Sequence, residues 1–525
     1  MPRPGSKPTL RTGRNAVRGL LLAAAWGALT PAKADFRVPP YLQNPAPTAI
    51  TLSWLSDGAD PGTVYLRGNA DSAETPARRF QATAVAAGAL DYHQAERERA
   101  GAAALRELPY LQQTRLEGLQ PGHRYQYVVQ QGEDQASGSF RTPEDGARPL
   151  RFVVFGDSET EPESTGKPAR WPAPGAEDSD RVYLVDQTTG YRANLAIMRS
   201  REPDFVAIAG DLVESGGEQR DWDEFWRQTS DLAANAFVLP ALGNHEYFGG
   251  PGGLGRYRTI DSERAVAKYL TYFDLPGNGA ARAAHHERYY RVDWGAVTLV
   301  VLDLNNAYPN RGRSDPNWFL LGRREGGMAP DWQHGSEQYR WLERTLAESQ
   351  ARSAFTFVMF HHCPYSSGVH GQPPGDGAGK DTLSGIPLRQ LTPLFLRYGV
   401  DVLLTGHDEM FEHSVIRGAH DLHVFDVGVG GDGLRGPVAA AHNPARVFLA
   451  HDDAPEQWSR DDRLLDGGKH YGHLEVNVAP QADGSWTARL EMVYAFPLTG
   501  AEGQITGFER RVYADPIILT SAPGK

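Results

Sequence analysis

From residue 150 onward, short apolar runs alternate with longer segments in which apolar residues recur at helical spacing. This alternation predicts an α/β domain, because strands that are apolar throughout need helices to cover their faces. The segments predicted as helices are 193–201, 221–232, 336–349 and 388–398. The runs predicted as strands are 150–155, 205–209, 237–242, 297–302, 355–360, 400–405 and 422–427.

Five of these runs are followed at once by a potential metal ligand. A single Asp or His after a strand is most often a helix cap or a hydrogen-bonded polar group. Five in the order Asp, Asp, Asn, His, His are far more specific, and the carboxyl ends of strands in α/β sheets converge on ligands. The residues are Asp157, Asp211, Asn244, His361 and His407.

The region before residue 145 has a different pattern. Residues 49–54 and 125–129 alternate between apolar and polar types, and Gly and Pro separate the runs, which predicts an all-β domain over 36–145. The opening P-P-Y-L-Q-N-P, the apolar Trp54 and the L-x-P-G-x-x-Y-x-Y segment resemble a fibronectin type III-like sandwich. Segments 160–192 and 305–335 are aperiodic, and the first is interpreted as a loop or lid.

Residues 1–34 have the pattern of an export signal. A basic start precedes an apolar run at 20–29 that is too short to span a bilayer, and Ala32-Lys33-Ala34 fits a cleavage site. We therefore expect a periplasmic or extracellular protein without stable membrane insertion. Without residues 1–34, 47 basic residues stand against 65 acidic ones, a net charge of −18. Such a chain repels nucleic acid, and we expect no such partner.

The motifs D-x-E, G-D-x-x-E, G-N-H-E, V-x-x-H and G-H-x-E stand here in the order found in one known superfamily. The sequence resembles the calcineurin-like metallophosphoesterases, and within them the purple acid phosphatase branch, which also carries an N-terminal β domain. The resemblance implies a four-layer α/β/β/α sandwich over 150–525, in which 473–478 and 488–493 form closing strands. It also implies two divalent metal ions and a small phosphate ester as substrate.

By the family pattern, Asp211 bridges the two ions. Asn244, His361 and His407 complete site two, and Asp157 belongs to site one. The chain departs from the pattern at three positions: Glu159 and Glu409 replace histidines of site one, and Glu214 replaces the tyrosine that colours purple enzymes. Site one would then be Asp157, Glu159, Asp211 and Glu409. Oxygen donors favour Ca²⁺, Mg²⁺ or Mn²⁺ there, whereas site two suits Zn²⁺, Fe or Mn²⁺.

The resemblance further implies that a metal-bridged hydroxide attacks phosphorus, with His245 protonating the leaving group or orienting the phosphate. Glu246 and Asp408 are interpreted as supports of the histidine ligands. His362 supports a ligand or contacts substrate, and Glu214 either binds the ion of site one or accepts a hydrogen bond. These assignments stay open at this stage.

Three functions compete on this constellation. The lead hypothesis is an exported phosphomonoesterase similar to acid phosphatases, and the second is a phosphodiesterase or nucleotidase, because both chemistries use the same core. The third is a non-catalytic, calcium-dependent binding protein. The glutamate replacements could also leave only one ion or an inactive enzyme. Substrate and oligomeric state are not determined by the sequence.

The assignment of site one predicts the outcome of a double substitution. Replacing Glu159 and Glu409 by His gives that site nitrogen donors, so metal content and the ion that best restores activity should shift from hard ions towards Zn²⁺ or Fe. Elemental analysis of the purified variant measures this shift. An unchanged metal preference would show that the assignment of site one is wrong.

Overall fold

The computed structural model describes most of the chain after residue 35. The described residues are 36–71, 74–100, 105–146, 148–172, 180–250, 259–305, 329–373, 383–439, 441, 443–450, 452–460, 463–500 and 503–524. The predicted export signal at 1–34 therefore lies outside them. None of the described helices combines the length and apolar character that crossing a membrane requires.

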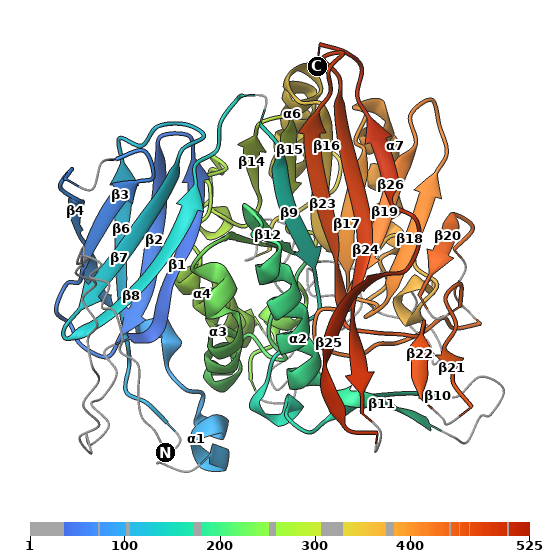
Figure 1. Cartoon of the computed structure of the whole chain (residues 1–525), viewed down its shortest axis with the longest axis horizontal. Coiled ribbons are helices and arrows are strands. Elements are labelled where there is room, and N and C mark those ends of the chain that lie inside the picture. Colours follow the sequence, from blue (N-terminus) through green and yellow to red (C-terminus); the bar gives the residue numbers. More distant parts are fainter. Residues whose placement is uncertain are drawn as a thin grey trace, which may run out of the picture. The chain divides into compact units, whose positions relative to one another are not determined.

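Two sheets face each other in the region after residue 150 (Figure 1). In the first sheet, β9 (Leu150–Phe155), β12 (Phe205–Ile208) and β13 (Phe237–Pro240) run parallel. In the second, β15 (Val297–Val301), β16 (Phe355–His362), β17 (Val402–Gly406) and β19 (Leu422–Val427) run parallel. All seven predicted strands are thus confirmed, with ends shifted by at most two residues.

Other strands complete both sheets. β23 pairs antiparallel with β9, and β24 pairs with β23, so the chain after residue 472 closes the sandwich as predicted. The flanking strands are β14 (Tyr290–Trp294), β18 (Phe411–Ile416), β20 (Arg446–Leu449), β23 (Gly472–Pro480), β24 (Trp486–Thr499), β25 (Ile505–Val512) and β26 (Ile517–Thr520).

The side chains of β16 show why four layers form. Phe357 and Met359 belong to the core between the sheets, where Phe357 meets Phe152 of β9 at a ring-centroid distance of 5.2 Å. Val358 and Phe360 point the other way, into a second core under the helices. Successive residues of a strand face opposite sides, so a strand that is apolar throughout has to be covered on both.

Helices cover the outer faces of the two sheets. α2 (Gln187–Ser200) and α3 (Gln219–Ala233) lie on the first sheet, and α6 (Glu337–Arg352) and α7 (Thr392–Arg397) lie on the second. These four confirm the predicted helices. The sequence pattern does not predict α4 (Thr259–Tyr272), because much of its buried face consists of alanine and tyrosine. Tertiary contacts stabilise this helix, such as the packing of Tyr272 on Trp222.

The N-terminal strands form two sheets joined by a buried Trp54, whose indole N–H donates to Gln131 Oε1 at 2.9 Å. One sheet has the order β4–β3–β7–β8. The other, β1–β2–β6–β5, continues the first large sheet, because β1 pairs parallel with β13 at Leu42 and Phe237. The strands are β1 (Phe36–Ala46), β2 (Ala49–Ser56), β3 (Thr63–Gly68), β4 (Arg78–Gln81), β5 (Thr83–Ala86), β6 (Tyr110–Glu117), β7 (Arg124–Gln131) and β8 (Asp134–Arg141).

One inserted segment is more ordered than expected. The prediction of an aperiodic loop over 160–192 is wrong in part: β10 (Pro168–Pro172) pairs with β11 (Asp180–Asp186), and α2 begins at Gln187 because Asp186 caps it. A second small pair is β21 (Gln457–Trp458) with β22 (Leu464–Asp466), and a short helix α1 spans Gln94–Ala100. Most of segment 305–335 lies outside the described residues.

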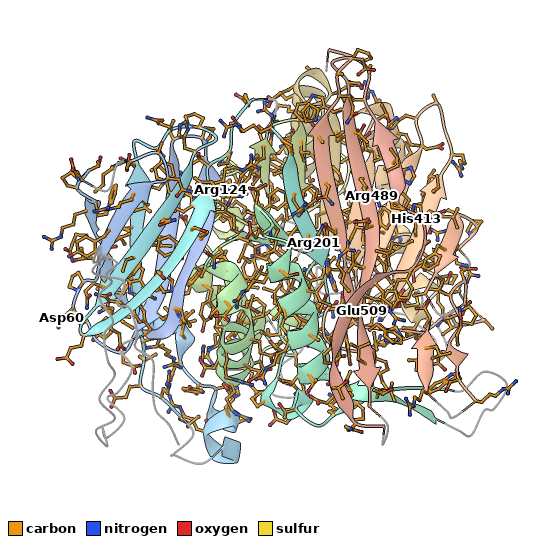
Figure 2. All side chains as sticks on the ribbon, viewed as in Figure 1. Asp60, Arg124, Arg201, His413, Arg489 and Glu509 are labelled. Carbon is orange, nitrogen blue, oxygen red and sulfur yellow. The ribbon has the colours of Figure 1, made fainter. Side chains whose placement is uncertain are left out.

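A buried carboxylate on β23 supports the strand that carries Asp157. Glu475 is fully buried and pairs with Arg201, labelled in Figure 2, and with Arg510, each N–O distance being 3.0 Å. Burial opposes ionisation of Glu475, but hydrogen bonds from Arg201 and Asn477 and the charge of Arg510 lower its pKa to about 2. The ionised carboxylate therefore stabilises the fold above its unfolded-state pKa of about 4.3.

We predict that Glu475→Gln lowers the free energy of unfolding at neutral pH by about 3 kcal/mol, because three arginines, including Arg151 at 3.6 Å, lose their buried partner. The wild type should lose this contribution as pH falls from about 4.3 towards 2, and the variant should lack that part of the acid dependence. Urea denaturation across this pH range measures both effects. Glu348→Gln, at an exposed ion pair with Arg291, is the control. Identical acid dependence in Glu475→Gln and wild type would contradict the prediction.

Candidate metal centre

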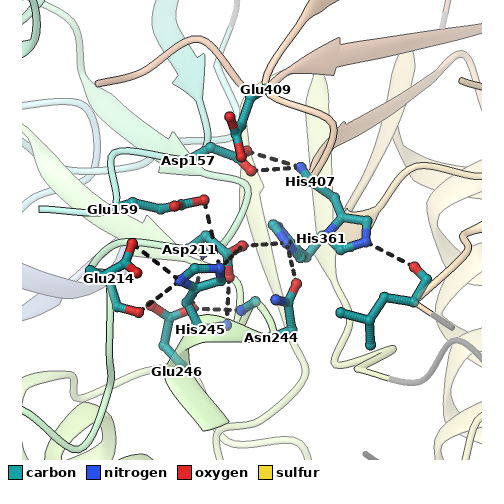
Figure 3. Close-up of polar contacts among 12 residues, drawn as sticks. Asp157, Glu159, Asp211, Glu214, Asn244, His245, Glu246, His361, His407 and Glu409 are labelled. Atoms are coloured by element: carbon teal, nitrogen blue, oxygen red, sulfur yellow. Dashed lines mark hydrogen bonds and ion pairs between the residues drawn. The ribbon is translucent and has the colours of Figure 1, made fainter. Parts of the chain in front are cut away.

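The five predicted strand-end residues come together at the carboxyl edges of the two sheets (Figure 3). The nearest approach is between His361 and Asp211, whose Nε2 and Oδ2 atoms lie 2.8 Å apart. The same His361 Nε2 lies 3.0 Å from Asn244 Oδ1 and 3.2 Å from His407 Nδ1. Four potential donor atoms therefore converge from β12, β13, β16 and β17, as the strand-end pattern predicts.

The hydrogen bonds on the far sides of the two imidazole rings suit metal binding. His361 Nδ1 contacts the carbonyl oxygen of Ala209 at 2.8 Å, and His407 Nε2 contacts that of Leu383 at 2.8 Å. A carbonyl only accepts, so each of these nitrogens carries a proton and the opposite nitrogen of each ring faces Asp211. Together with one carboxylate and one amide oxygen, they form a mixed nitrogen and oxygen donor set that fits Zn²⁺, Fe or Mn²⁺.

The other half of the site contains only oxygen donors. Among the described residues, Glu159, Glu409 and Asp432 each bring a carboxylate oxygen within 4.8 Å of the others. Glu159 also forms such a group with Asp211 and His245, so it links the two halves. The donor chemistry fits a hard cation. Asp432 was missed from the sequence, although it lies five residues after the predicted strand 422–427 and the strand-end argument could have found it.

Asp157 lies between the two halves but in none of these groups. Its carboxylate accepts the backbone N–H of His407 at 2.8 and 3.0 Å, which ties the end of β9 to the end of β17. Burial raises the pKa of Asp157 to about 8; His361 opposes this shift and Asp211 adds to it. A buried carboxylate that resists ionisation in this way gains most from a nearby cation.

Site residues carry much of the backbone strain in the molecule. Five non-glycine residues of the predicted ligand set have positive φ angles: Asp157 (55°), Glu159 (37°), Asp211 (51°), His407 (81°) and Glu409 (49°). This region of backbone conformation costs a side-chain-bearing residue of order 1 kcal/mol or more, and such strain concentrates at functional sites. The sharp turns after the strands are therefore made largely by the ligand residues themselves.

Two of the neighbouring glycines are needed because a side chain at their positions would collide with a carboxylate. A Cβ atom on Gly243 would lie 2.0 Å from Asp211 Oδ1, and one on Gly406 would lie 2.1 Å from Asp157 Oδ2. Any side chain at either position would displace a carboxylate. The G-N-H-E and G-H-D-E motifs thus need glycine because the backbone passes directly against the ligands.

Glu246 holds the backbone and not a histidine ring, which corrects its expected role. Its fully buried carboxylate accepts the N–H groups of Asp211 (3.0 Å), Leu212 (2.8 Å) and Gly243 (2.7 Å). Burial raises its pKa to about 7, Asp211 adds to the shift, and the amides oppose it. Glu246 therefore fixes the loop that presents Asp211.

Asp408 likewise orders a loop and not a ligand ring. Its carboxylate accepts the hydroxyl of Ser366 and the backbone N–H of His370, the latter at 2.9 Å. The ring of His370 stacks on that of His407 with centroids 3.8 Å apart, a neighbour that the sequence did not indicate. Asp408 thus supports His407 indirectly, through the segment that packs on it.

His362 and Glu214 both lie beside the site: the ring of His362 packs against His361 and His407, and Glu214 contacts His245. The ring of His362 is buried, and neither nitrogen has a hydrogen-bond partner within the described part of the chain. Burial and the neighbouring His361 hold its pKa well below the usual value, so it stays neutral. Glu214 is partly exposed, and burial together with Asp432 and Glu161 raises its pKa to about 7.

His245 faces the ligands through one nitrogen. Its Nδ1 donates to the carbonyl oxygen of Glu214 at 2.7 Å, and its ring packs on Phe248. Its Nε2 lies 3.8 Å from Glu159 Oε1 and 3.9 Å from Asp211 Oδ2. The backbone N–H of His245 also donates to Asp211 Oδ1 at 2.8 Å. The ring is thus fixed beside the Asp211 carboxylate, with Nε2 directed at Glu159 and Asp211.

The charge of this centre is balanced by histidine. Burial lowers the pKa of His361, but Asp211 outweighs it and raises the pKa to about 9. Burial opposes ionisation of Asp211, yet His361 and His245 bring its pKa below the usual value. A proton on His361 therefore supplies the positive charge next to Asp211 in the protein without metal.

The chain is similar to a known family and to several known proteins. Residues 150–409 match the family model of the calcineurin-like phosphoesterases. An uncharacterized protein of Mycobacterium tuberculosis is 28% identical over 58% of this chain and 51% of its own length. A protein of Arabidopsis thaliana named probable inactive purple acid phosphatase 27 is 23% identical over 59% of this chain and 44% of its own length. The chain thus matches about half the length of these relatives.

Solved structures show the same fold. The purple acid phosphatase PPD1 of yellow lupin has a TM-score of 0.56 at 17% identity, covering 90% of this chain and 73% of its own. PhoD has a TM-score of 0.56 at 13% identity, covering 95% and 94%. At these identities the likeness concerns the fold alone, and it includes the sheets whose edges carry the site.

We predict that Glu246→Gln destabilises the protein by about 1–3 kcal/mol, because the amide group cannot accept from all three backbone donors. The loop carrying Asp211 should shift, and the purified variant should hold less metal than wild type. Thermal unfolding and elemental analysis measure these effects, with the more exposed Glu343→Gln as control. Wild-type stability and metal content in Glu246→Gln would contradict the role given to Glu246.

Proposed function

Residues 150–409 form a calcineurin-like phosphoesterase domain, and from this premise we propose that the protein is an exported two-metal phosphomonoesterase. The observation that carries the proposal is the convergence of Asp211, Asn244, His361 and His407 beside His245. A site of nitrogen and oxygen donors alone could serve a binding protein. The adjacent His245, held with Nε2 directed at the bridging carboxylate, supports catalysis.

Bound divalent ions would polarise the phosphoryl group and lower the pKa of water. We propose that Asp211, Asn244, His361 and His407 hold one ion, and that Glu159, Glu409, Asp157 and Asp432 hold the other with Asp211 shared. The contact of His245 Nδ1 with the Glu214 carbonyl leaves Nε2 to give a proton to the leaving oxygen. Glu159 and Asp211, both within 4 Å of this nitrogen, compensate the charge of the protonated ring.

The proposed reaction class is hydrolysis of a small phosphate monoester outside the cytoplasm. The export pattern of residues 1–34 supports that location. The net charge of −18 after residue 34 argues against nucleic acid as a partner. A surface of this charge repels anionic substrates, so the ions and nearby cationic side chains would have to attract them.

Chelation tests the proposal directly. The purified protein should contain metal, lose hydrolysis of p-nitrophenyl phosphate after chelation, and regain it when ions are returned. Turnover of the monoester should exceed that of bis-p-nitrophenyl phosphate. A preference for the bis ester would favour a phosphodiesterase, and Ca²⁺ binding without any hydrolysis would favour a non-catalytic binding protein.

We predict that His245→Ala lowers kcat by roughly 10²- to 10⁴-fold, the range expected for loss of a general acid. The loss should be smaller for substrates with a good leaving group, such as p-nitrophenyl phosphate, than for alkyl phosphates, because a weakly basic leaving oxygen needs less protonation. Metal content should remain. His334→Gln, at an exposed position, is the control. Equal losses on both substrate types would argue against proton donation by His245.

A further inference from the structure

Arg435 is bound to one of the proposed ligands. Its guanidinium Nη2 forms an ion pair with Glu409 Oε1, and its backbone N–H donates to the Glu409 carbonyl oxygen at 2.9 Å. The Glu409 side chain is 3% exposed, whereas the Arg435 side chain is 45% exposed. The arginine therefore reaches from the surface to a carboxylate inside the oxygen-rich half of the site.

This half of the site needs a positive charge. Glu159, Glu409 and Asp432 each bring a carboxylate oxygen within 4.8 Å of the other two, so a cation placed among them reduces the repulsion between their negative charges. Two cations, Lys167 and Arg435, act on Asp432. Lys167 Nζ is engaged 3.0 Å from Glu161 Oε1. Arg435 is thus a cation in direct contact with a proposed ligand of this half.

The local turn keeps Arg435 next to Glu409. Gly433 has a φ of 68°, and a Cβ atom there would lie 1.5 Å from Glu409 Oε2. This close approach places Asp432 and Arg435 on either side of the glycine, against the same glutamate. The guanidinium is not enclosed: the Arg435 side chain is 45% exposed, and its Nη1 lies 3.4 Å from His370 Nε2 in an exposed contact.

We propose that Arg435 is an exchangeable counter-ion: it neutralises Glu409 in the metal-free protein and must release it when a hard cation binds. A guanidinium and a divalent cation on one carboxylate would repel each other strongly in this buried setting. The competition weakens cation binding to Glu159, Glu409 and Asp432. The inference rests on the ligand assignment made under the proposed function, but it concerns binding and not turnover.

Calcium titration of the chelator-stripped full chain tests the competition, because Ca²⁺ prefers oxygen donors. Arg435→Gln should bind Ca²⁺ more tightly than wild type by about tenfold or more, since the competing charge is gone. Arg435→Lys keeps the charge and should stay much closer to wild type. Arg417→Gln, at an exposed ion pair with Asp421, is the matched control.

A second variant locates the effect. In a Glu409→Gln background, Arg435→Gln should no longer tighten Ca²⁺ binding, because the contested carboxylate is absent. Thermal unfolding provides an independent readout: Arg435→Gln should lower the Tm of the metal-free protein and increase the rise in Tm on adding Ca²⁺.

Unchanged, weaker or undetectable Ca²⁺ binding in Arg435→Gln would overturn the proposal, as would the same gain in the Glu409→Gln background. These results are independent of the proposed activity. If Arg435→Gln binds Ca²⁺ more tightly but the protein hydrolyses no phosphate ester, the counter-ion proposal is supported and the proposed phosphomonoesterase activity is contradicted. If the protein hydrolyses phosphate esters but substitution of Arg435 leaves Ca²⁺ affinity unchanged, the proposed function is supported and the counter-ion proposal is contradicted.

Discussion

The close contact of Asp211 with His361 is the interaction on which the site depends. It joins the end of β12 in one sheet to the end of β16 in the other, at a distance of 2.8 Å. Both groups are almost fully buried, so neither charge is stable there without the other. Further carboxylates lie around this pair. Each one increases the electrostatic repulsion in the centre unless a positive charge is present.

The rest of the structure holds these groups in place against their repulsion. Glu246 uses three backbone amides to fix the loop of Asp211, and Asp157 accepts the amide of His407 from the opposite sheet. Glycines at 243 and 406 let backbone pass within contact distance of the carboxylates. The positive φ angles of five ligand residues are tolerated because buried strands and helices surround every turn.

The two halves of the site differ in the donor atoms that their side chains supply. Histidines whose outer nitrogens donate to backbone carbonyls give one half fixed nitrogen donors. Glutamates at 159 and 409 give the other half oxygen donors, and Asp432 adds a third carboxylate from a neighbouring turn. Arg435 forms an ion pair with Glu409 in this second half. A single fold thus places two electrostatically distinct sites side by side, with Asp211 at their boundary.

The sequence by itself determined the strands, their order along the chain and the potential metal ligand that follows each of five strands, because apolar periodicity and strand-end motifs are local properties. Tertiary structure alone decided that Glu246 binds backbone amides, that β1 extends the sheet of β13, and that Arg435 reaches Glu409. These contacts join residues distant in the chain or turn on loop conformation, and their partners are chosen by packing, which no local pattern records.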